Sequence, residues 1–515
     1  MLFVLSNCGS TSKLAQVQNE TFTYAANVEI MPGGWDPSTD YSSELIAMAQ
    51  MYEGLTRYNA VDKKVEPLLA ESFDSSNGGK QWTFTLRSGV KFHTGRPLTA
   101  LAAKAAIERT IKLGQGAAYI WDPVKSIDTP DAHTLVFHLK YAAPLDLIAS
   151  AGYASWIFDT KAAGSGDLGK WFAAGRDAGT GPYTVDTWQP GQEVQVTLKA
   201  FPGYWGGWSG TRYQRVVFRY VPAATTTVQL LKAGDVNAEM QLTPQLWASF
   251  QNDPNFLTTS TPSYYNFFAM LNTQRAPLSD VRVRQAIAYG INYDGIVAVL
   301  KGNAVKSSGI VPAGLFGHFD DLPNYTYDPT KAEALLREAG YGPGGKNIKL
   351  VLTYEQGDNF EAMTSAVIKS SLAPLNIDVG VRPLQWSVLW AKTQASDLSQ
   401  RQDIAIYGWY PDYPDPASWF VNLFETQNPP VYNATYYSNQ TVDRMIGEAM
   451  KLTASDRPKA ETQYRDIQVK LLQDVPAVPL VGMVYQRVLP RSVSGFQDDP
   501  AYPDVVFVYQ LTPVK

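Results

Sequence analysis

The segment from Ile404 to Phe420 reads IAIYGWYPDYPDPASWF, a short apolar run followed by a loop rich in proline, aromatic residues and aspartate. The run Ile404–Ile406 predicts a buried strand that ends at Gly408. The loop Trp409–Pro416 contains three prolines, and because proline fixes φ the loop loses little entropy when a ligand binds. Flat apolar faces beside fixed carboxylates suit a cationic or amphipathic small ligand. The alternative is an ordinary surface loop whose tryptophan packs into the core.

Length and composition limit the class of protein. A chain of 515 residues is too long for one hydrophobic core, so two or more domains are expected. The net charge of −5 and the lack of a basic run argue against nucleic acid as a partner. Mean hydropathy is −0.19, and no apolar stretch reaches the roughly 18 residues that predict a membrane-spanning helix.

Signatures of metal and cofactor sites are missing from the sequence. The four histidines, His93, His133, His138 and His318, lack the spacing of a zinc site. The segment Gly340–Asn347 nearly matches a phosphate-binding loop, but it leaves a predicted helix and enters a predicted strand, the reverse of what such a loop requires. It is interpreted as a helix C-cap and turn, and neither a metal nor a cofactor is expected.

One enzymatic alternative stays open on the residues alone. A glycoside hydrolase needs two carboxylates about 5 to 10 Å apart on either side of the scissile bond. Asp412 with Asp415 or Glu425, among aromatic residues, offers such a pair. Acidic pairs occur in any large protein, so this signal is weak, and no enzymatic activity is expected.

The N-terminus resembles the end of a bacterial lipoprotein signal. An apolar run leads through Leu5–Ser6–Asn7 to Cys8, the only cysteine, and then to a polar stretch. Residues 1–19 are therefore expected to be a signal remnant and lipid-anchor tether, although the apolar part is short and no positive segment precedes it. A lipidated Cys8 would hold the protein at a membrane surface without spanning the membrane. The alternative is an accidental match.

The pattern of predicted elements changes near residue 263. Alternating strands such as Trp82–Leu86 dominate the first half, whereas strands and helices alternate after residue 263, which favours a mainly parallel sheet there. Asp328 is expected to cap a helix that has Pro329 at its first position. The end of the chain returns to strand, predicted at 478–481 and at 505–508.

Read together, these segments resemble the bacterial extracytoplasmic solute-binding proteins of family 5, the peptide/nickel class that serves ABC importers. The resemblance extends from Thr23 to about Val508. Each motif is modest alone, but the set is specific in its order and spacing. The matching stretches are Tyr52–Leu55, Leu69–Ser72, Trp82–Gly95, Gly179–Tyr183, Asn272–Thr273, Pro277, Asp280, Arg282–Ala286 and Tyr407–Trp409 with Asp412.

The resemblance implies an α/β fold, the two-lobe periplasmic-binding-protein fold of type II, with an extra subdomain in lobe one. Lobe one would take residues 20–262 plus 478–515, with the subdomain at about 60–170. Lobe two would take residues 263–477. The ligand would lie between the lobes and be enclosed when they close.

The resemblance also implies site residues. In peptide binders of this family, the residue matching Asp412 pairs with the ligand's α-ammonium, and the residues matching Trp386 and Trp409 flank a side-chain pocket. At two positions where relatives hold a basic residue for the ligand carboxylate, this chain has Ala362 and Ile406, which puts a dipeptide with a fixed C-terminus in doubt. Further candidate ligand-binding residues, which could equally be packing residues, are Tyr410, Trp35, Tyr119 and Trp121.

The expected function is capture of a small amphipathic solute, with an oligopeptide as first choice, and delivery to the membrane permease of an ABC importer. An oligosaccharide or an opine-like sugar conjugate is the alternative ligand. The protein is expected to be extracytoplasmic, to act as a monomer, to bind no nucleic acid and to touch the membrane only through a possible lipid anchor at Cys8.

Overall fold

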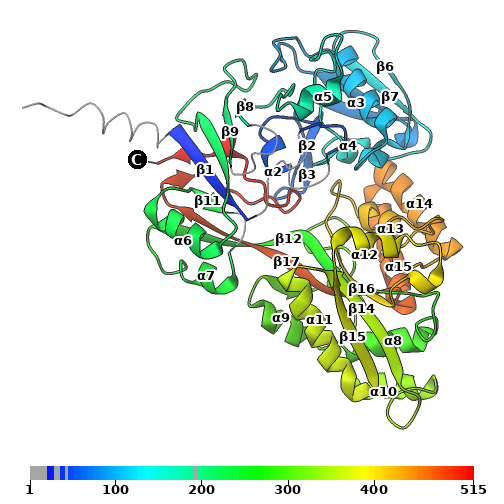
Figure 1. Cartoon of the computed structure of the whole chain (residues 1–515). Helices are drawn as coiled ribbons and strands as arrows, with labels where there is room; N and C mark the ends of the chain where they lie inside the picture. The colour runs from blue at the N-terminus through cyan, green and yellow to red at the C-terminus, as the bar shows by residue number, and fades with distance from the viewer. Residues whose placement is uncertain (1–19, 28–34, 41–44, 189–194, 240–241, 515) are drawn as a thin grey trace, which may run out of the picture.

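The computed structural model describes residues 20–27, 35–40, 45–188, 195–239 and 242–514. Cys8 and the predicted tether at 1–19 lie outside these residues. None of the helices within the described ranges is both long enough and apolar enough to cross a bilayer. Helices and strands form several sheets of different size, which Figure 1 shows as an upper and a lower body connected by long strands.

The first lobe is built on a five-stranded sheet. Strand β1 (Thr21–Ala26) lies between β11 (Ala238–Glu239) and β10 (Arg215–Tyr220) and is parallel to both. Strands β9 (Gln195–Ala200) and β8 (Tyr183–Thr187) continue the sheet beyond β10 in antiparallel pairs. Other elements before residue 256 are α2 (Leu45–Met48), β2 (Thr56–Asn59), β3 (Lys64–Pro67), η1 (Asn77–Gly79), η2 (Ala118–Trp121), α4 (Leu145–Ile148), α5 (Leu168–Ala173), α6 (Ala224–Ala233) and α7 (Pro244–Ala248).

An extra subdomain extends the first lobe. Its antiparallel sheet has the order β4 (Ala70–Ser76), β5 (Gln81–Leu86), β7 (Thr134–Leu139) and β6 (Val124–Asp128). In β5, Trp82, Phe84 and Leu86 are buried and their neighbours are partly exposed, as the alternating pattern predicts. Helix α3 (Ala100–Leu113) begins at Thr99, whose side chain accepts a hydrogen bond from the amide of Ala102.

The second lobe is built on a six-stranded sheet in the order β13 (Ala304–Lys306), β17 (Ala477–Pro490), β12 (Phe256–Leu271), β16 (Ile404–Trp409), β14 (Ile348–Glu355) and β15 (Ile377–Leu384). Only β14 pairs in parallel, with β15 and with β16. The prediction of a mainly parallel sheet is therefore wrong. The sheet is largely antiparallel because β12 and β17, which carry the chain into and out of this lobe, lie inside it as antiparallel partners.

Helices cover this second sheet and extend beyond it. Asp328 caps α10 (Pro329–Glu338), as the sequence predicts, by accepting a hydrogen bond from a backbone amide of the first turn. Asp280 caps α8 (Val281–Gly290) in the same way. The other helices are α9 (Tyr293–Leu300), α11 (Asn359–Leu372), α12 (Trp386–Thr393), α13 (Ala417–Leu423), α14 (Gln440–Ser455) and α15 (Arg457–Asp474).

Strands β12 and β17 pair along nearly their whole length, from Phe256 opposite Pro490 to Met270 opposite Ala477. Figure 1 shows them running side by side between the two bodies. Their register shifts between Pro262 and Asn266. We propose this irregular stretch as the outward boundary between the lobes, at the division expected between residues 262 and 263. Because β13 pairs with β17 up to Met483, we place the return boundary inside β17, a few residues beyond 478.

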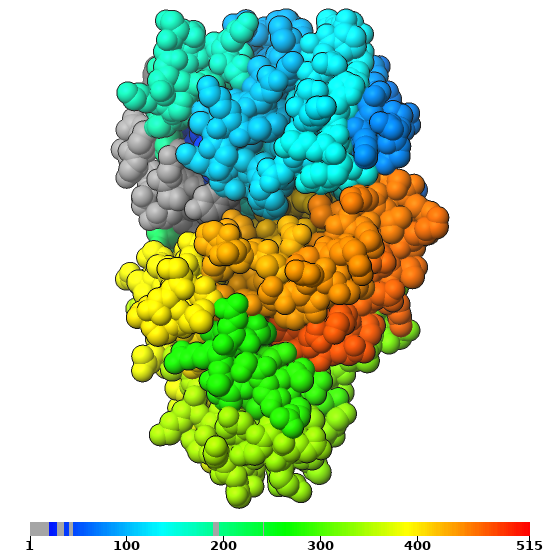
Figure 2. All heavy atoms as spheres, turned by 90° about the vertical axis from the view of Figure 1, so that its right-hand side faces the viewer, coloured from blue at the N-terminus to red at the C-terminus, as the bar shows by residue number. Residues whose placement is uncertain are grey.

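The subdomain of the first lobe also contacts the second lobe away from these strands. Arg457 at the start of α15 donates to Asp146 of α4 at 2.5 Å, and one continuous apolar cluster includes both Phe84 of the subdomain and Tyr464 of α15. Figure 2 shows this contact as the cyan residues lying against the orange ones. A second cluster, which includes Ile406 of β16, forms the core under the helices of the six-stranded sheet.

The predicted strand at 505–508 is wrong, because these backbone groups pair with a side chain instead of another strand. The amide of Gln50 donates to the Val506 carbonyl at 2.9 Å and accepts from the Val508 amide at 3.1 Å. The segment leads into the short helix η5 (Val508–Gln510), and the chain then forms the small pair β18 (Val493–Ser494) with β19 (Thr512–Pro513).

Gly179 lies where no side chain fits, and this can be tested. A Cβ atom there would lie 2.0 Å from the Met51 carbonyl oxygen, so we expect Gly179→Ala to lower the free energy of unfolding by about 2–4 kcal/mol. The matched control is Gly447→Ala within α14, where an added Cβ meets nothing within 4 Å and should stabilise by about 0.5–1 kcal/mol. Melting temperatures check both; equal melting of Gly179→Ala and wild type would contradict the packing described.

Candidate functional site

A cavity of about 380 Å³ lies where β16 and its following loop face the first lobe. Small-ligand pockets in proteins typically measure about 300–1,000 Å³. Both lobes contribute: η2 and Tyr153 come from the first, and α12, β16 and the loop after it come from the second. The residues that line it are Gly116, Ala117, Tyr119, Tyr153, Trp386, Trp390, Tyr407, Gly408, Trp409, Tyr410, Asp412 and Tyr432.

Strand β16 sets which side chains reach the cavity. Side chains alternate along a strand, and here Tyr407 belongs with Ala405 to the cluster toward the first lobe, whereas Ile404 and Ile406 belong to the core under the helices. Gly408 lies against the ring of Tyr265, and a Cβ atom at Gly408 would be 2.5 Å from the Tyr265 hydroxyl. The strand can therefore pass close to this tyrosine only with glycine at that position.

The loop after β16 is fixed by Ser418 of α13. The Ser418 hydroxyl accepts from the backbone amide of Asp412 and from the indole nitrogen of Trp409, both at 3.2 Å. The Tyr119 hydroxyl, from the first lobe, donates to the Asp412 carboxylate and accepts from the Asn422 side chain at 3.0 Å. Asp412 is thus positioned by its own lobe and contacted across the cavity by the other.

Asp412 is a half-buried carboxylate without a cationic partner among the described residues. Its hydrogen bonds there are to Tyr119 and Ser418, and it forms no ion pair with a described lysine, arginine or histidine. Burial raises the pKa of Asp412 to about 6, an increase that the hydrogen bonds from Tyr119 and Ser418 partly offset. A carboxylate in this environment gains strongly from a positively charged group placed beside it.

Aromatic rings form one wall of the cavity. Trp386 stacks on Trp390 with ring centroids 5.2 Å apart and an interplanar angle of 15°, and Trp390 stacks on Tyr407 at 5.7 Å. Tyr432 lies 5.5 Å from Trp390 and 5.4 Å from Trp409. Trp386 is 47 % exposed, so one end of this stack is open to a further flat group.

Tyrosines form the side of the cavity nearest Asp412. Tyr410 lies 5.4 Å from Tyr265 and 6.5 Å from Tyr153, measured between ring centroids. Burial raises the pKa of Tyr410 to about 12, so its hydroxyl stays protonated near neutral pH and can donate or accept a hydrogen bond.

The structure brings together five of the seven ligand-binding residues that the sequence predicted: Asp412, Trp409, Trp386, Tyr410 and Tyr119 all line the cavity. The other two are core residues. Trp35 is 0 % exposed and packs on Trp188 at 4.6 Å. Trp121 is 1 % exposed, stacks on Phe137 and donates to the Ala154 carbonyl at 2.8 Å. The expectation that these two rings are available for stacking is wrong, because both are enclosed by other side chains.

Sequence reasoning missed four aromatic residues of the lining, Tyr153, Trp390, Tyr407 and Tyr432. Trp390 follows Trp386 by four positions, one helical turn, and Tyr407 precedes Trp409 by two positions on the same strand face, so periodicity could have found both. Tyr153 and Tyr432 reach the cavity from separate segments, and nothing in their local sequence indicates this.

The other positions considered from the sequence do not face the cavity. Asp415 is fully buried, accepts from the Ala417 amide at 2.7 Å and from the Tyr464 hydroxyl at 2.8 Å, and so fixes the start of α13. Ile406 is 1 % exposed in the core under the helices, and Ala362 lies in α11. No group of three or more potential metal ligands occurs within the described ranges.

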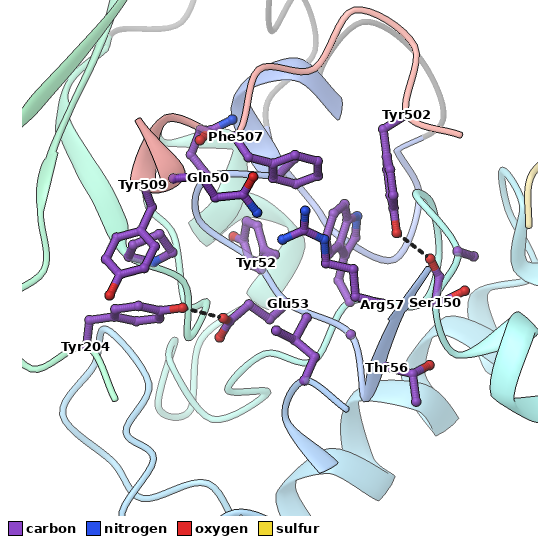
Figure 3. Close-up of a pocket in the computed structure, with 17 residues that line it drawn as sticks. Gln50, Tyr52, Glu53, Thr56, Arg57, Ser150, Tyr204, Tyr502, Phe507 and Tyr509 are labelled. Atoms are coloured by element: carbon purple, nitrogen blue, oxygen red, sulfur yellow. Dashed lines mark hydrogen bonds between the residues drawn. The ribbon is translucent and has the colours of Figure 1, made fainter. Parts of the chain in front are cut away.

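A second, smaller cavity lies within the first lobe, next to the C-terminal segment (Figure 3). Its volume is about 80 Å³, room for a few water molecules rather than an organic ligand. Glu53 at its edge accepts hydrogen bonds from Thr180, Tyr204 and Trp205. The guanidinium of Arg57 lies 4.1 Å from the centre of the Phe507 ring. Because its buried carboxylate is already satisfied, this cavity is the weaker candidate.

Comparisons with known proteins agree with the fold. Residues 64–430 match the family described as bacterial extracellular solute-binding proteins, family 5 Middle. The probable D,D-dipeptide-binding periplasmic protein DdpA of Escherichia coli is 30 % identical over 458 residues, covering 87 % of this chain and 86 % of that protein.

Solved structures show the same fold. The periplasmic binding protein DppA of Helicobacter pylori, in complex with the peptide STSA, aligns with a TM-score of 0.81 at 22 % identity, covering 98 % of this chain and 100 % of that one. AgaA of A. tumefaciens in complex with agropinic acid aligns with a TM-score of 0.79 at 23 % identity, covering 96 % and 99 %. The chain belongs to family 5 of the bacterial extracellular solute-binding proteins, and so is an extracytoplasmic binding protein of ABC import rather than an enzyme.

Proposed function

We propose that this protein captures a small amphipathic solute with an amino group, an oligopeptide in the first instance, and delivers it to the membrane permease of an ABC importer. The observation that carries this proposal is the half-buried carboxylate of Asp412, which lies in a cavity between the lobes without a cationic partner among the described residues. An ammonium group of the ligand would supply the missing charge.

Closure of the two lobes would complete the site. Tyr119 contacts Asp412 from the opposite lobe, so the solute binds where the lobes meet. The paired strands β12 and β17, with their register shift near Pro262, are the connection about which closure takes place. We propose that the protein acts as a monomer. Any attachment to the membrane would be through Cys8, which lies outside the described residues.

The names of several relatives support a small ligand that bears an amine. By their names, relatives bind D,D-dipeptides, di- and tripeptides and glutathione. An opine-like sugar conjugate is the second candidate, because the open aromatic stack at Trp386 suits a sugar ring and because Ala362 and Ile406 offer no cation for a peptide carboxylate. Native mass spectrometry of the protein as purified, followed by release and mass measurement of any bound molecule, distinguishes a peptide from a sugar conjugate.

The role of Asp412 in binding can be tested by charge removal. We expect Asp412→Asn to weaken binding of the co-purified amine ligand by about 2–5 kcal/mol in isothermal titration calorimetry, because the ammonium loses its buried counter-charge. The matched control is Asp378→Asn, the same change on an exposed residue of β15, which should leave affinity unchanged. An Asp412→Asn protein that binds the ligand as tightly as wild type would show that the ammonium binds elsewhere.

The same charge should cost stability when no ligand is present. Because burial raises the pKa of Asp412 to about 6, the unfolded chain loses this proton at lower pH than the folded one. The loss of folding stability caused by the ionised Asp412 is therefore absent below about pH 4 and complete above about pH 6. We therefore expect ligand-free Asp412→Asn to be more stable than wild type at pH 8 by about 1–2 kcal/mol, after allowance for solvent screening, and equally stable at pH 4.

Thermal unfolding at both pH values measures this difference. Asp131→Asn is the control of opposite sign, because hydrogen bonds from the His133 amide and the Thr134 hydroxyl lower the pKa of Asp131, so that loss of its charge should destabilise the protein at pH 8. A lower melting temperature for ligand-free Asp412→Asn at pH 8 would mean that the carboxylate is satisfied by the protein itself.

A further inference from the structure

The described lining of the cavity contains one charged residue, and that residue is an acid. Of the residues that line it, Asp412 alone is charged at neutral pH, and the rest are aromatic, glycine or alanine. The sequence of the internal segments outside the description, 28–34, 41–44, 189–194 and 240–241, contains no lysine, arginine or histidine. A cation for a ligand carboxylate is therefore missing from the described lining and from these segments alike.

The charged neighbours that act on the lining tyrosines are also acids. Burial is the main cause that raises the pKa values of Tyr153, Tyr407 and Tyr410. Asp412 raises all three further, and Asp40 raises those of Tyr153 and Tyr410. Behind Tyr410, two further acids, Glu361 and Asp358, lie near Tyr265. Burial raises the pKa of Glu361 to about 8, so this group is mostly protonated near neutral pH. A carboxylate placed in this cavity would lose its hydration and face the Asp412 carboxylate instead of a cation, which is strongly unfavourable.

The aromatic wall complements this negative field. Trp386, Trp390 and Tyr407 form a continuous stack, and the outer ring, Trp386, is 47 % exposed. Faces of aromatic rings carry partial negative charge, so they attract flat rings and cations alike. Stack and carboxylate line the same cavity of about 380 Å³, so a compact molecule can reach both.

We propose that the part of the ligand enclosed by this cavity is an organic cation: an amine joined to a flat or sugar ring, with no carboxylate. This inference rests on the proposed function and narrows its ligand class. The amine lies at Asp412, the ring lies on Trp386, and a carboxylate, where the whole ligand has one, lies outside the cavity. A short zwitterion, with amine and carboxylate a few bonds apart, is rejected.

The test uses pairs of compounds that differ in a carboxylate. Tyramine is compared with tyrosine, the amide of the dipeptide Phe-Ala with the free dipeptide, and glucosamine with 2-amino-2-deoxyglucuronic acid, which has a carboxylate at C6. Each comparison uses calorimetry at neutral pH with ligand-free protein. We expect the carboxylate-free member of every pair that binds to be tighter by at least about tenfold. The pair that binds best identifies the ring as aromatic, peptide or sugar.

The outcomes separate this inference from the proposed function. If a free acid binds as tightly as its carboxylate-free partner, or more tightly, the inference is overturned, whereas the proposed function stands provided that Asp412→Asn weakens that acid. If no amine of the panel binds at millimolar concentrations, the inference is likewise overturned. If compounds bind equally well to wild type and Asp412→Asn, both fail together.

The ring contact is tested separately with Trp386→Ala. Because Trp386 is nearly half exposed at the start of α12, its removal should not disturb folding, and we expect affinity for the best ring-bearing amine to fall by about 3- to 10-fold. Val388→Ala is the matched control, since Val388 is 44 % exposed on the same helix and does not line the cavity. Equal losses for the two variants, or no loss for Trp386→Ala, would contradict stacking on Trp386.

Discussion

The carboxylate of Asp412 lies among aromatic rings at the junction of two lobes, and the part of the chain that the structure describes gives it no cation. A charge in such a place is unfavourable for the folded protein alone. Hydrogen bonds from Tyr119 and Ser418 reduce that cost. A positively charged ligand would relieve the rest of this unfavourable free energy. The buried charge of Asp412 therefore destabilises the ligand-free protein and favours the complex with ligand.

The rest of the fold holds this group in position. Strand β16 is an interior strand between β12 and β14. The loop that carries Asp412 follows the last residue of this strand and lines the cavity between the lobes. Ser418 fixes the loop through two hydrogen bonds, and its prolines restrict the backbone. Strands β12 and β17 connect the lobes as one paired ribbon. This connection allows the two lobes to move relative to each other without separating. The aromatic stack on α12 and β16 then provides a rigid apolar surface beside the charge.

Much of this could be predicted from the sequence where the signal is local. Capping by Thr99, Asp280 and Asp328, the alternation of Trp82 and Phe84, and the strand at Ile404 each depend on a few neighbouring residues. The order of motifs indicated the family, and the position of Asp412 at the junction of the lobes followed from the resemblance.

Features that depend on distant contacts could not be predicted in this way. Trp35 and Trp121 resemble ligand-stacking residues in sequence, but partners such as Trp188 and Phe137 enclose them. The antiparallel pairing in the second sheet depends on β12 and β17, which are more than two hundred residues apart in sequence. Val505 to Val508 reads as a strand, yet Gln50 takes the backbone hydrogen bonds that a neighbouring strand would need.

The most direct measurement is a crystal structure of the protein with the solute that co-purifies with it. We predict a nitrogen atom of the solute within about 3.2 Å of a carboxylate oxygen of Asp412, with the remainder of the solute between the two lobes. A solute that lies outside this cavity, or that leaves the Asp412 carboxylate bonded only to Tyr119 and other protein groups, would contradict the central role of this charge.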